Sequence, residues 1–212
     1  LTTSTIKGEG KTIVSTNVSK LLSQNNKVLL LGADLRNPQI HKFFDKNRDE
    51  IKGLTNYIFS QNNKDWKDYV IKINNLDILF SGDIPPNPRI AISNNKLKDL
   101  IKEAKNIYDY VIVDSAPCLL VSDTLEISKL CDMTLYVFRA NYTPSDLSTF
   151  IKELVNTDKV NNLSLVFNGV GDSNFYGYKY GYQYGYSYGY KYAYNYGYGY
   201  GYGNEDKDKE NI

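Results

Sequence analysis

The chain has 212 residues with a nearly balanced charge, 25 Lys and Arg against 24 Asp and Glu. This balance gives no electrostatic indication of a nucleic-acid partner or of an anionic membrane surface. No apolar run reaches the about 20 residues that cross a bilayer, and no signal peptide precedes the first motif, so we expect a soluble chain. Cys118 and Cys131 lie in apolar contexts that favour buried thiols in a reducing compartment over a disulfide or metal pair.

The first motif is a glycine-rich loop at 7–12, Lys-Gly-Glu-Gly-Lys-Thr. Its glycines let backbone N–H groups approach phosphate oxygens, Lys11 can reach the β- and γ-phosphates, and Thr12 can bind Mg²⁺. The alternative is a chance match in a surface turn, because Thr5 stands where the G-x-x-x-x-G-K-[ST] pattern has its first glycine. Such loops normally follow a buried strand of about five residues, so we infer an N-terminal truncation. The predicted nucleotide-binding residues are Gly8, Glu9, Gly10, Lys11 and Thr12.

The remaining apolar patterns predict an α/β fold. Residues 12–22 carry apolar side chains at helical spacing, which predicts a helix whose N-terminus faces the phosphates. Continuous apolar runs predict strands buried on both faces, and helical patterns lie between them. We therefore predict a P-loop NTPase-like, mostly parallel sheet with helices on both faces. The predicted strands are 27–33, 110–113, 134–138 and 163–167, the further helices are 97–104 and 147–155, and 85–88 (Pro-Pro-Asn-Pro) is a rigid loop.

Beyond Gly171 the composition changes to Tyr-Gly dipeptides followed by a charged run at 205–210. Strict alternation would place the tyrosines on one face of a strand, but the intervening glycines disfavour strands and bury nothing. We predict a P-loop kinase domain at 1–172 and a disordered Tyr/Gly-rich tail at 173–212. The tail holds fourteen of the twenty tyrosines, Tyr176, Tyr178, Tyr180, Tyr182, Tyr184, Tyr186, Tyr188, Tyr190, Tyr192, Tyr194, Tyr196, Tyr198, Tyr200 and Tyr202.

Two of the apolar runs end in an aspartate, Asp34 and Asp114. An isolated aspartate at a strand end is ordinarily a turn residue, but ligands of such sheets bind beyond the carboxyl ends of the strands. We therefore predict that both carboxylates face the nucleotide and, together with Thr12, hold Mg²⁺. The single histidine, His41, follows Pro38 in a loop, and we assign it no chemical role.

Several motifs together resemble the bacterial tyrosine autokinases of exopolysaccharide and capsule synthesis, over the whole chain. They are the phosphate loop, Asp34-Leu35-Arg36-Asn37-Pro38, the Gly-Asp-Ile-Pro-Pro-Asn-Pro loop at 82–88, Tyr-Asp-Tyr-Val-Ile-Val-Asp-Ser-Ala-Pro at 108–117, Asp123 and the terminal tyrosines. The resemblance implies an ATP-dependent protein-tyrosine kinase with Lys11 and Thr12 in Walker A, Asp34 in Walker A′ and Asp114 in Walker B. Lys11, Asp34 and Asp114 would be catalytic, with an aspartate accepting the phenolic proton and the tail tyrosines as phosphoacceptors.

The same resemblance implies partners and a location. The tail would be phosphorylated by a neighbouring subunit of a homo-oligomer, and the cycle would regulate polysaccharide synthesis and export. A membrane-anchored polysaccharide co-polymerase or adaptor, fused upstream or separate, would hold the kinase at the cytoplasmic face of the plasma membrane. A tyrosine phosphatase would reverse the reaction.

Three positions depart from the family pattern. Gly32 stands where the first aspartate of Walker A′ is expected, Lys7 replaces a proline, and Arg-Ile-Ala at 89–91 replaces a small residue, Glu and Leu-Leu. Gly32 leaves open a catalytically weak or inactive nucleotide-binding regulator of polysaccharide export. A partitioning or septum-positioning ATPase is a further alternative, but Ile6 occupies the place of its characteristic lysine and the tail would be unexplained.

Overall fold

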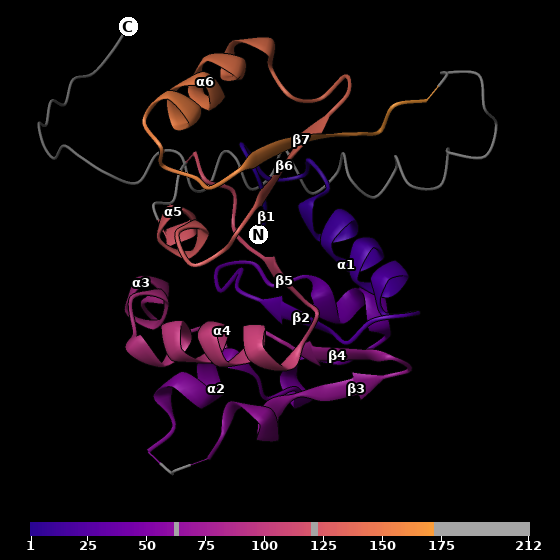
Figure 1. The fold of residues 1–212 in the computed structure, drawn as a ribbon, viewed down its shortest axis with the longest axis vertical. Helices are drawn as coiled ribbons and strands as arrows, with labels where there is room; N and C mark the ends of the chain where they lie inside the picture. Colours follow the sequence, from indigo (N-terminus) through magenta and orange to yellow (C-terminus); the bar gives the residue numbers. More distant parts are fainter. Residues whose placement is uncertain (62–63, 120–122, 172–212) are drawn as a thin grey trace, which may run out of the picture. The chain divides into compact units, whose positions relative to one another are not determined.

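The computed structural model describes residues 1–61, 64–119 and 123–171. Its centre is a seven-stranded sheet with the order β3-β4-β2-β5-β1-β6-β7 (Figure 1). Every neighbouring pair is parallel except β3 and β4, which are antiparallel. The strands are β1 (Thr2–Ser4), β2 (Val28–Gly32), β3 (Ile71–Ile73), β4 (Leu76–Leu79), β5 (Tyr110–Asp114), β6 (Thr134–Arg139) and β7 (Leu163–Asn168).

Helices cover both faces of this sheet, which confirms the predicted fold class. Helix α1 and the 3₁₀ turn η1 lie on one face, and α2 to α5 pack on the other (Figure 1). The α-helices are α1 (Lys11–Leu22), α2 (Leu54–Phe59), α3 (Pro88–Ile92), α4 (Asn95–Ile107), α5 (Asp123–Ser128) and α6 (Ser148–Asn156). The 3₁₀ turns are η1 (Ile40–Phe44), η2 (Arg48–Glu50), η3 (Trp66–Tyr69) and η4 (Ser145–Leu147).

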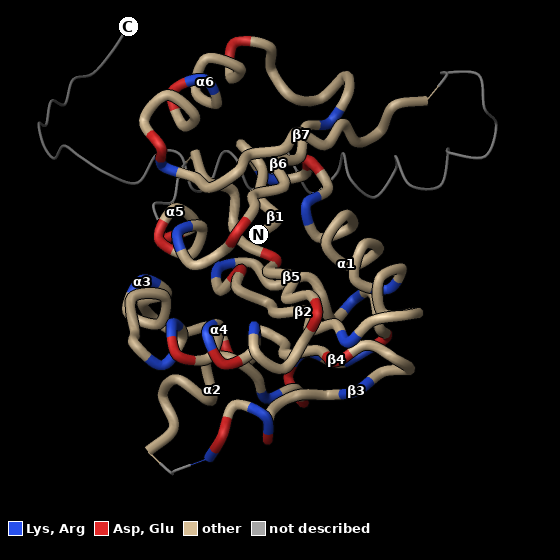
Figure 2. The backbone as a smooth tube through the Cα atoms, in the orientation of Figure 1, with Lys and Arg blue, Asp and Glu red and all other residues tan. Residues whose placement is uncertain are grey.

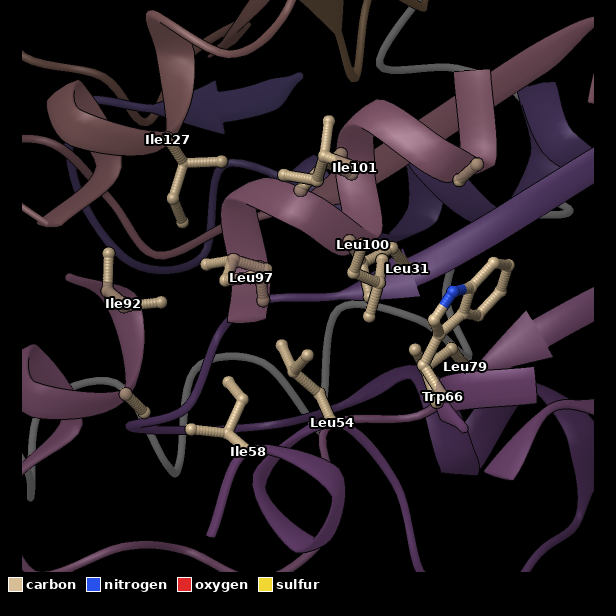
Figure 3. Close-up of a cluster of buried hydrophobic side chains, with 14 of the residues drawn as sticks. Leu31, Leu54, Ile58, Trp66, Leu79, Ile92, Leu97, Leu100, Ile101 and Ile127 are labelled. Carbon is tan, nitrogen blue, oxygen red and sulfur yellow. The ribbon is translucent and has the colours of Figure 1, made fainter. Parts of the chain in front are cut away.

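The larger core lies between β2 and helices α2 to α5. Leu31 and Leu79 project from the sheet towards Leu54 of α2 and Leu97 and Leu100 of α4 (Figure 3). Each of these side chains is at most 1% exposed. Helix α4 fits this place because its apolar residues recur every three or four positions, so one face is buried and the opposite face carries its charges.

Helix α1 packs differently from its prediction. The helix forms where expected, but its apolar residues Ile13 and Leu21 are 46% and 67% exposed. Its buried side is polar instead and includes Ser15, Thr16 and Ser19. Small hydroxyl side chains let the helix approach the sheet closely, and Ser15 and Ser19 also donate to carbonyls of their own helix. The apolar spacing therefore located the helix but not its buried face.

Two other expectations are wrong. The run at 163–167 forms β7, but Leu165 and Phe167 are 51% and 63% exposed because β7 is an edge strand of the sheet. The proline segment is not irregular throughout, because Pro88 begins α3. A proline fits the first helical position since it lacks the N–H that would have no partner there, and the Asn87 side chain accepts from the N–H of Arg89.

The prediction of a disordered tail and all fourteen tail tyrosines lie outside the described residues. Within the described part of the chain, no helix is long and apolar enough to span a membrane. Figure 2 shows both signs of charge interleaved along the backbone, with basic and acidic positions alternating along α4.

We predict that the cost of truncating a leucine follows this burial. Leu97→Ala should lower the free energy of unfolding by about 2–5 kcal/mol, since it leaves a cavity under α4. The matched change Leu165→Ala, on the exposed side of β7, should cost less than about 1 kcal/mol. Urea unfolding of both variants measures the difference, and equal costs would contradict the assigned core.

Candidate nucleotide-binding site

The glycine-rich loop connects β1, which lies between β5 and β6 in the sheet, to the N-terminus of α1. Gly8 and Gly10 adopt φ values of 91° and 98°, which non-glycine residues rarely take. A Cβ atom on Gly10 would lie 2.0 Å from the side-chain amide nitrogen of Asn168, so a larger residue would displace that amide as well as strain the backbone. Because the first N–H groups of a helix have no partner within it, this loop presents donors and a positive dipole end to an anion.

Residues at the end of β6, just after it and at the end of β7 hold the loop in place. Asn168 donates its side-chain amide to the carbonyl of Glu9 at 2.9 Å. Arg139 donates to the carbonyl of Gly8 at 3.0 Å, and the Tyr142 hydroxyl donates to the carbonyl of Lys7 at 2.9 Å. Three consecutive loop carbonyls are therefore bound to the protein, which fixes the orientation of the peptide groups between them.

Glu9 is directed inward. Its carboxylate accepts from the backbone N–H of Ile6 at 2.7 Å and from the hydroxyl of Thr143, and the residue has no exposed surface. Burial raises the pKa of this carboxyl, although these hydrogen bonds oppose the shift. The side chain thus belongs to the loop's support, and only its backbone is placed for the predicted nucleotide contact.

Thr5, at the place of the first glycine in the loop pattern, is also buried. Its hydroxyl accepts from the Tyr136 hydroxyl of β6 at 3.0 Å. The Cys118 thiol lies 3.3 Å from the same tyrosine oxygen. The departure from glycine is thus accommodated by a hydrogen-bonded side chain pointing towards β6. Cys118 and Cys131 are free buried thiols, as predicted.

Lys11 and Asp34 form a buried ion pair, with Nζ and Oδ2 2.8 Å apart. Burial alone would lower the pKa of Lys11, but the carboxylates of Asp34 and Asp114 outweigh it and raise this pKa. Burial alone would raise the pKa of Asp34. The charge of Lys11 and two backbone N–H donors outweigh this effect, so the pKa of Asp34 is lowered. Both groups are therefore charged, and the ammonium is placed at the ends of β2 and β5.

Asp114 ends β5 against the first turn of α1. Its carboxylate accepts from the Thr12 and Ser15 hydroxyls, each at 3.0 Å. Burial raises the pKa of Asp114 to about 6, while Lys11 and these hydroxyls oppose the rise. A buried carboxylate beside a threonine hydroxyl supplies the oxygen ligands that Mg²⁺ prefers.

A second ion pair connects the segment after β2 to α5. Arg36 and Asp123 approach to 2.7 Å, with the aspartate buried at the N-terminus of the helix. The backbone N–H groups of Arg36 and Asn37 donate to Asp34 Oδ1. The turn that positions Asp34 is therefore fixed from two directions.

Gly32 ends β2 opposite Asp114 in the sheet register. A Cβ atom there would lie 2.7 Å from the Ser81 hydroxyl and 2.9 Å from the Ser81 backbone nitrogen. The second contact involves backbone, so any side chain at this position requires the segment after β4 to move. The packing against Ser81 therefore favours glycine at position 32, and this glycine leaves out the carboxylate that the family pattern has there.

The structure thus brings together the predicted residues Gly8, Gly10, Lys11, Thr12, Asp34 and Asp114. Sequence reasoning missed the side chains that position them, which are Ser15, Arg139, Tyr142, Thr143 and Asn168. The polar side of α1 was a signal for Ser15, because a serine one turn after the loop faces the same strand end. The loop supports around β6 and β7 gave no local signal, since they act across more than 130 residues.

A glycine-rich loop at the head of a helix, beneath two aspartates at the ends of parallel strands, defines a nucleotide-binding protein of the P-loop NTPase type. Residues 4–166 match the family described as AAA domain. Tyrosine-protein kinase YwqD of Bacillus subtilis (strain 168) is 34% identical over 180 residues, which cover 83% of this chain and 75% of the relative. Tyrosine-protein kinase CpsD of Streptococcus agalactiae serotype III (strain NEM316) is 35% identical over 174 residues, covering 81% and 74%.

Solved structures agree with these relatives. The kinase domain of the Escherichia coli tyrosine kinase ETK superposes with a TM-score of 0.70 at 26% identity, covering 84% of this chain and 71% of that one. This chain belongs to the bacterial tyrosine-protein kinases, and the resemblance read from its motifs is confirmed.

We predict that Lys11→Met lowers the affinity for Mg·ADP by at least about tenfold, because a charged partner of the phosphates is lost. Lys20→Met is the matched control. Lys20 lies on the same helix and donates to the carbonyl of Phe43 at 3.3 Å on the surface. Titration calorimetry compares the two, and equal affinities of wild type and Lys11→Met would refute the site.

Proposed function

We propose that this chain is an ATP-dependent autokinase that phosphorylates the C-terminal tyrosines of a neighbouring subunit. The observation that carries the proposal is the combination of the Lys11, Asp34 and Asp114 site with fourteen evenly spaced tyrosines in one chain. A glycine-spaced tail suits an acceptor, because each tyrosine can enter an active site without disturbing a fold.

The described residues fit a Mg·ATP complex. The loop N–H groups and Lys11 would bind the phosphates, and Thr12, Asp34 and Asp114 would hold the metal directly or through water. When bound, Mg²⁺ would neutralise the charge that develops on the transferred phosphoryl group. Lys11 would exchange Asp34 for a phosphate oxygen, and its ion pair with Asp34 holds the ammonium at the strand ends where that oxygen would bind.

The role in polysaccharide synthesis rests on the relatives. One of them, 36% identical over 163 residues, is described as a putative tyrosine-protein kinase in the cps region of Klebsiella pneumoniae. By this relationship we assign the chain to the regulation of exopolysaccharide or capsule synthesis and export. The partners proposed with it are further kinase subunits, a membrane-anchored co-polymerase or adaptor, and a tyrosine phosphatase, with the kinase at the cytoplasmic face of the membrane.

A nucleotide-binding regulator that transfers no phosphoryl group is the second candidate, and Gly32 is the observation that favours it. In that case the loop, Lys11 and Asp114 would bind nucleotide and change the protein's interactions, while the tail would act as a docking segment. The two candidates share the nucleotide site and differ only in the formation of phosphotyrosine.

The first test is intact mass after incubation with Mg·ATP. We expect the native chain to gain multiples of one phosphoryl group, and Asp114→Asn to slow this gain by about 10²-fold or more, since a metal ligand is lost. Asp109→Asn is the matched control at the other end of β5, where the side chain only accepts from the N–H of Lys27. Replacing all fourteen tail tyrosines by Phe should abolish the gain. Nucleotide binding without any mass gain in the native chain would favour the regulator.

The second test is Gly32→Asp. If a carboxylate at this position takes part in transfer, the variant should form phosphotyrosine faster than the native chain. Because a Cβ atom there crowds the backbone of Ser81, we also expect a lower melting temperature. Rate and thermal unfolding are therefore measured together. An unchanged rate in a folded variant would show that position 32 has no part in the chemistry.

A further inference from the structure

Three side chains bind the carbonyl oxygens of three consecutive residues of the phosphate loop. They come from the end of β6, from the turn after it and from the end of β7, two strands that lie on the same side of β1 (Figure 1). The pairs are Tyr142 with Lys7, Arg139 with Gly8 and Asn168 with Glu9, at donor–acceptor distances of 2.9, 3.0 and 2.9 Å. Each of these peptide groups therefore has a partner side chain of its own.

The partner of a carbonyl also decides where the next N–H group points. A trans peptide group is planar, with its C=O and N–H on opposite sides. The three partners therefore turn the N–H groups of Gly8, Glu9 and Gly10 away from the side chains that bind the carbonyls. Among the residues that the structure describes, these N–H groups have no acceptor. The backbone has a positive φ at Gly8 and Gly10 but not at Glu9, an alternation typical of loops that bind an anion through successive N–H groups.

Two of the partners belong to one turn, residues 139–143, which is held closed by its own hydrogen bonds. The N–H of Arg139 donates to the Thr143 hydroxyl at 2.9 Å, and the N–H of Thr143 donates to the Arg139 carbonyl at 3.0 Å. The Arg139 guanidinium lies over the ring of Tyr142, 5.0 Å from its centroid. The Thr143 hydroxyl donates to the carboxylate of Glu9, so the turn contacts the loop at a third place. Because of these contacts, the turn meets the loop as one unit.

Tyr142 offers the smallest change that tests these contacts. The side chain is 38% exposed, and its hydroxyl lies against the loop, 2.6 Å from the place of a Cβ atom on Gly8. Replacing this tyrosine by phenylalanine removes the hydroxyl and keeps the ring beneath Arg139. Tyr110 is the matched control, because it is 44% exposed and begins β5, at the end of the strand opposite Asp114.

We propose that Tyr142, Arg139 and Asn168 are positioning residues for the nucleotide phosphates, each holding one N–H donor of the loop in its binding direction. The inference deepens the function proposed above and rests on its nucleotide site. A carbonyl without its partner lets the peptide group rotate, and the N–H then has to be turned back when the phosphates bind. This reorientation lowers the affinity, although no group that contacts the ligand has been removed.

The first experiment compares matched variants by titration with Mg·ADP. Tyr142→Phe should lower the affinity about fivefold, the effect of one hydrogen bond, and Tyr110→Phe should leave it unchanged. Asn168→Asp replaces the amide donor by an acceptor of the same shape, so it should lower the affinity at least as much. Arg139→Met should lower it likewise, and Arg139→Lys, which keeps a cationic donor, should recover part of the loss.

The second experiment distinguishes the loop from the nucleoside. Mg·pyrophosphate contains the phosphate groups alone, so a variant that acts through the loop should lose the same factor for it as for Mg·ADP. In the transfer reaction, Tyr142→Phe should raise the KM for Mg·ATP by that factor and leave kcat unchanged, because the N–H donors bind the substrate and the transition state alike. The melting temperature should stay near that of the native chain, since the lost hydrogen bond lies at the surface.

The outcomes separate this inference from the proposed function. Binding of Mg·ADP by the native chain with equal affinities in Tyr142→Phe and Asn168→Asp would overturn the positioning roles and leave the nucleotide site in place. A native chain that does not bind Mg·ADP would overturn the function and this inference together. A loss for Mg·ADP that is absent for Mg·pyrophosphate would show a contact with the nucleoside, and a lower kcat at unchanged KM would show a catalytic role. Either result would contradict positioning through the loop.

Discussion

The buried ammonium of Lys11 between the carboxylates of Asp34 and Asp114 is the interaction on which the site depends. A buried aspartate without a partner would destabilise the fold by several kcal/mol. The pairing is therefore favourable only when the ends of β2 and β5 lie against the first turn of α1, which carries Lys11. The sheet order satisfies this need because β2 and β5 are neighbours and β1 follows. The same lysine is the proposed partner of the phosphates, so one ammonium would serve both the packing of the strand ends and the binding of a nucleotide.

The loop itself depends on two different supports. On the side of β5, the small hydroxyl residues of α1 let the helix lie close to the sheet, so Thr12 and Ser15 reach Asp114. On the side of β6 and β7, side chains from the ends of these strands bind the loop carbonyls, and Thr143 binds Glu9. Carbonyls held in this way leave the N–H groups directed to the other side, which is where an anion would bind. A nucleotide thus finds its donors already arranged.

Much of this could be predicted from local patterns. The apolar runs of β2, β5 and β6, bounded by breakers, located the central strands because a strand buried on both faces needs continuous apolar residues. Short strands such as β1 and β3 and short helices such as α2 carry too few residues for a periodic signal, and they were missed. Exposure of β7 could not be predicted either, because it follows from the strand's place at the edge of the sheet.

The sequence by itself determined the loop, its lysine and the two aspartates, since each depends on residues that are neighbours in the chain. The tertiary structure alone decided which side chains support them. Asn168 reaches Glu9 across 159 positions and Tyr142 reaches Lys7 across 135, and local spacing contains no information on such contacts. It also placed His41 beside Ser81, because two loops meet only after β2 and β4 have paired. Strand pairing, a long-range event, is the physical reason for the difference.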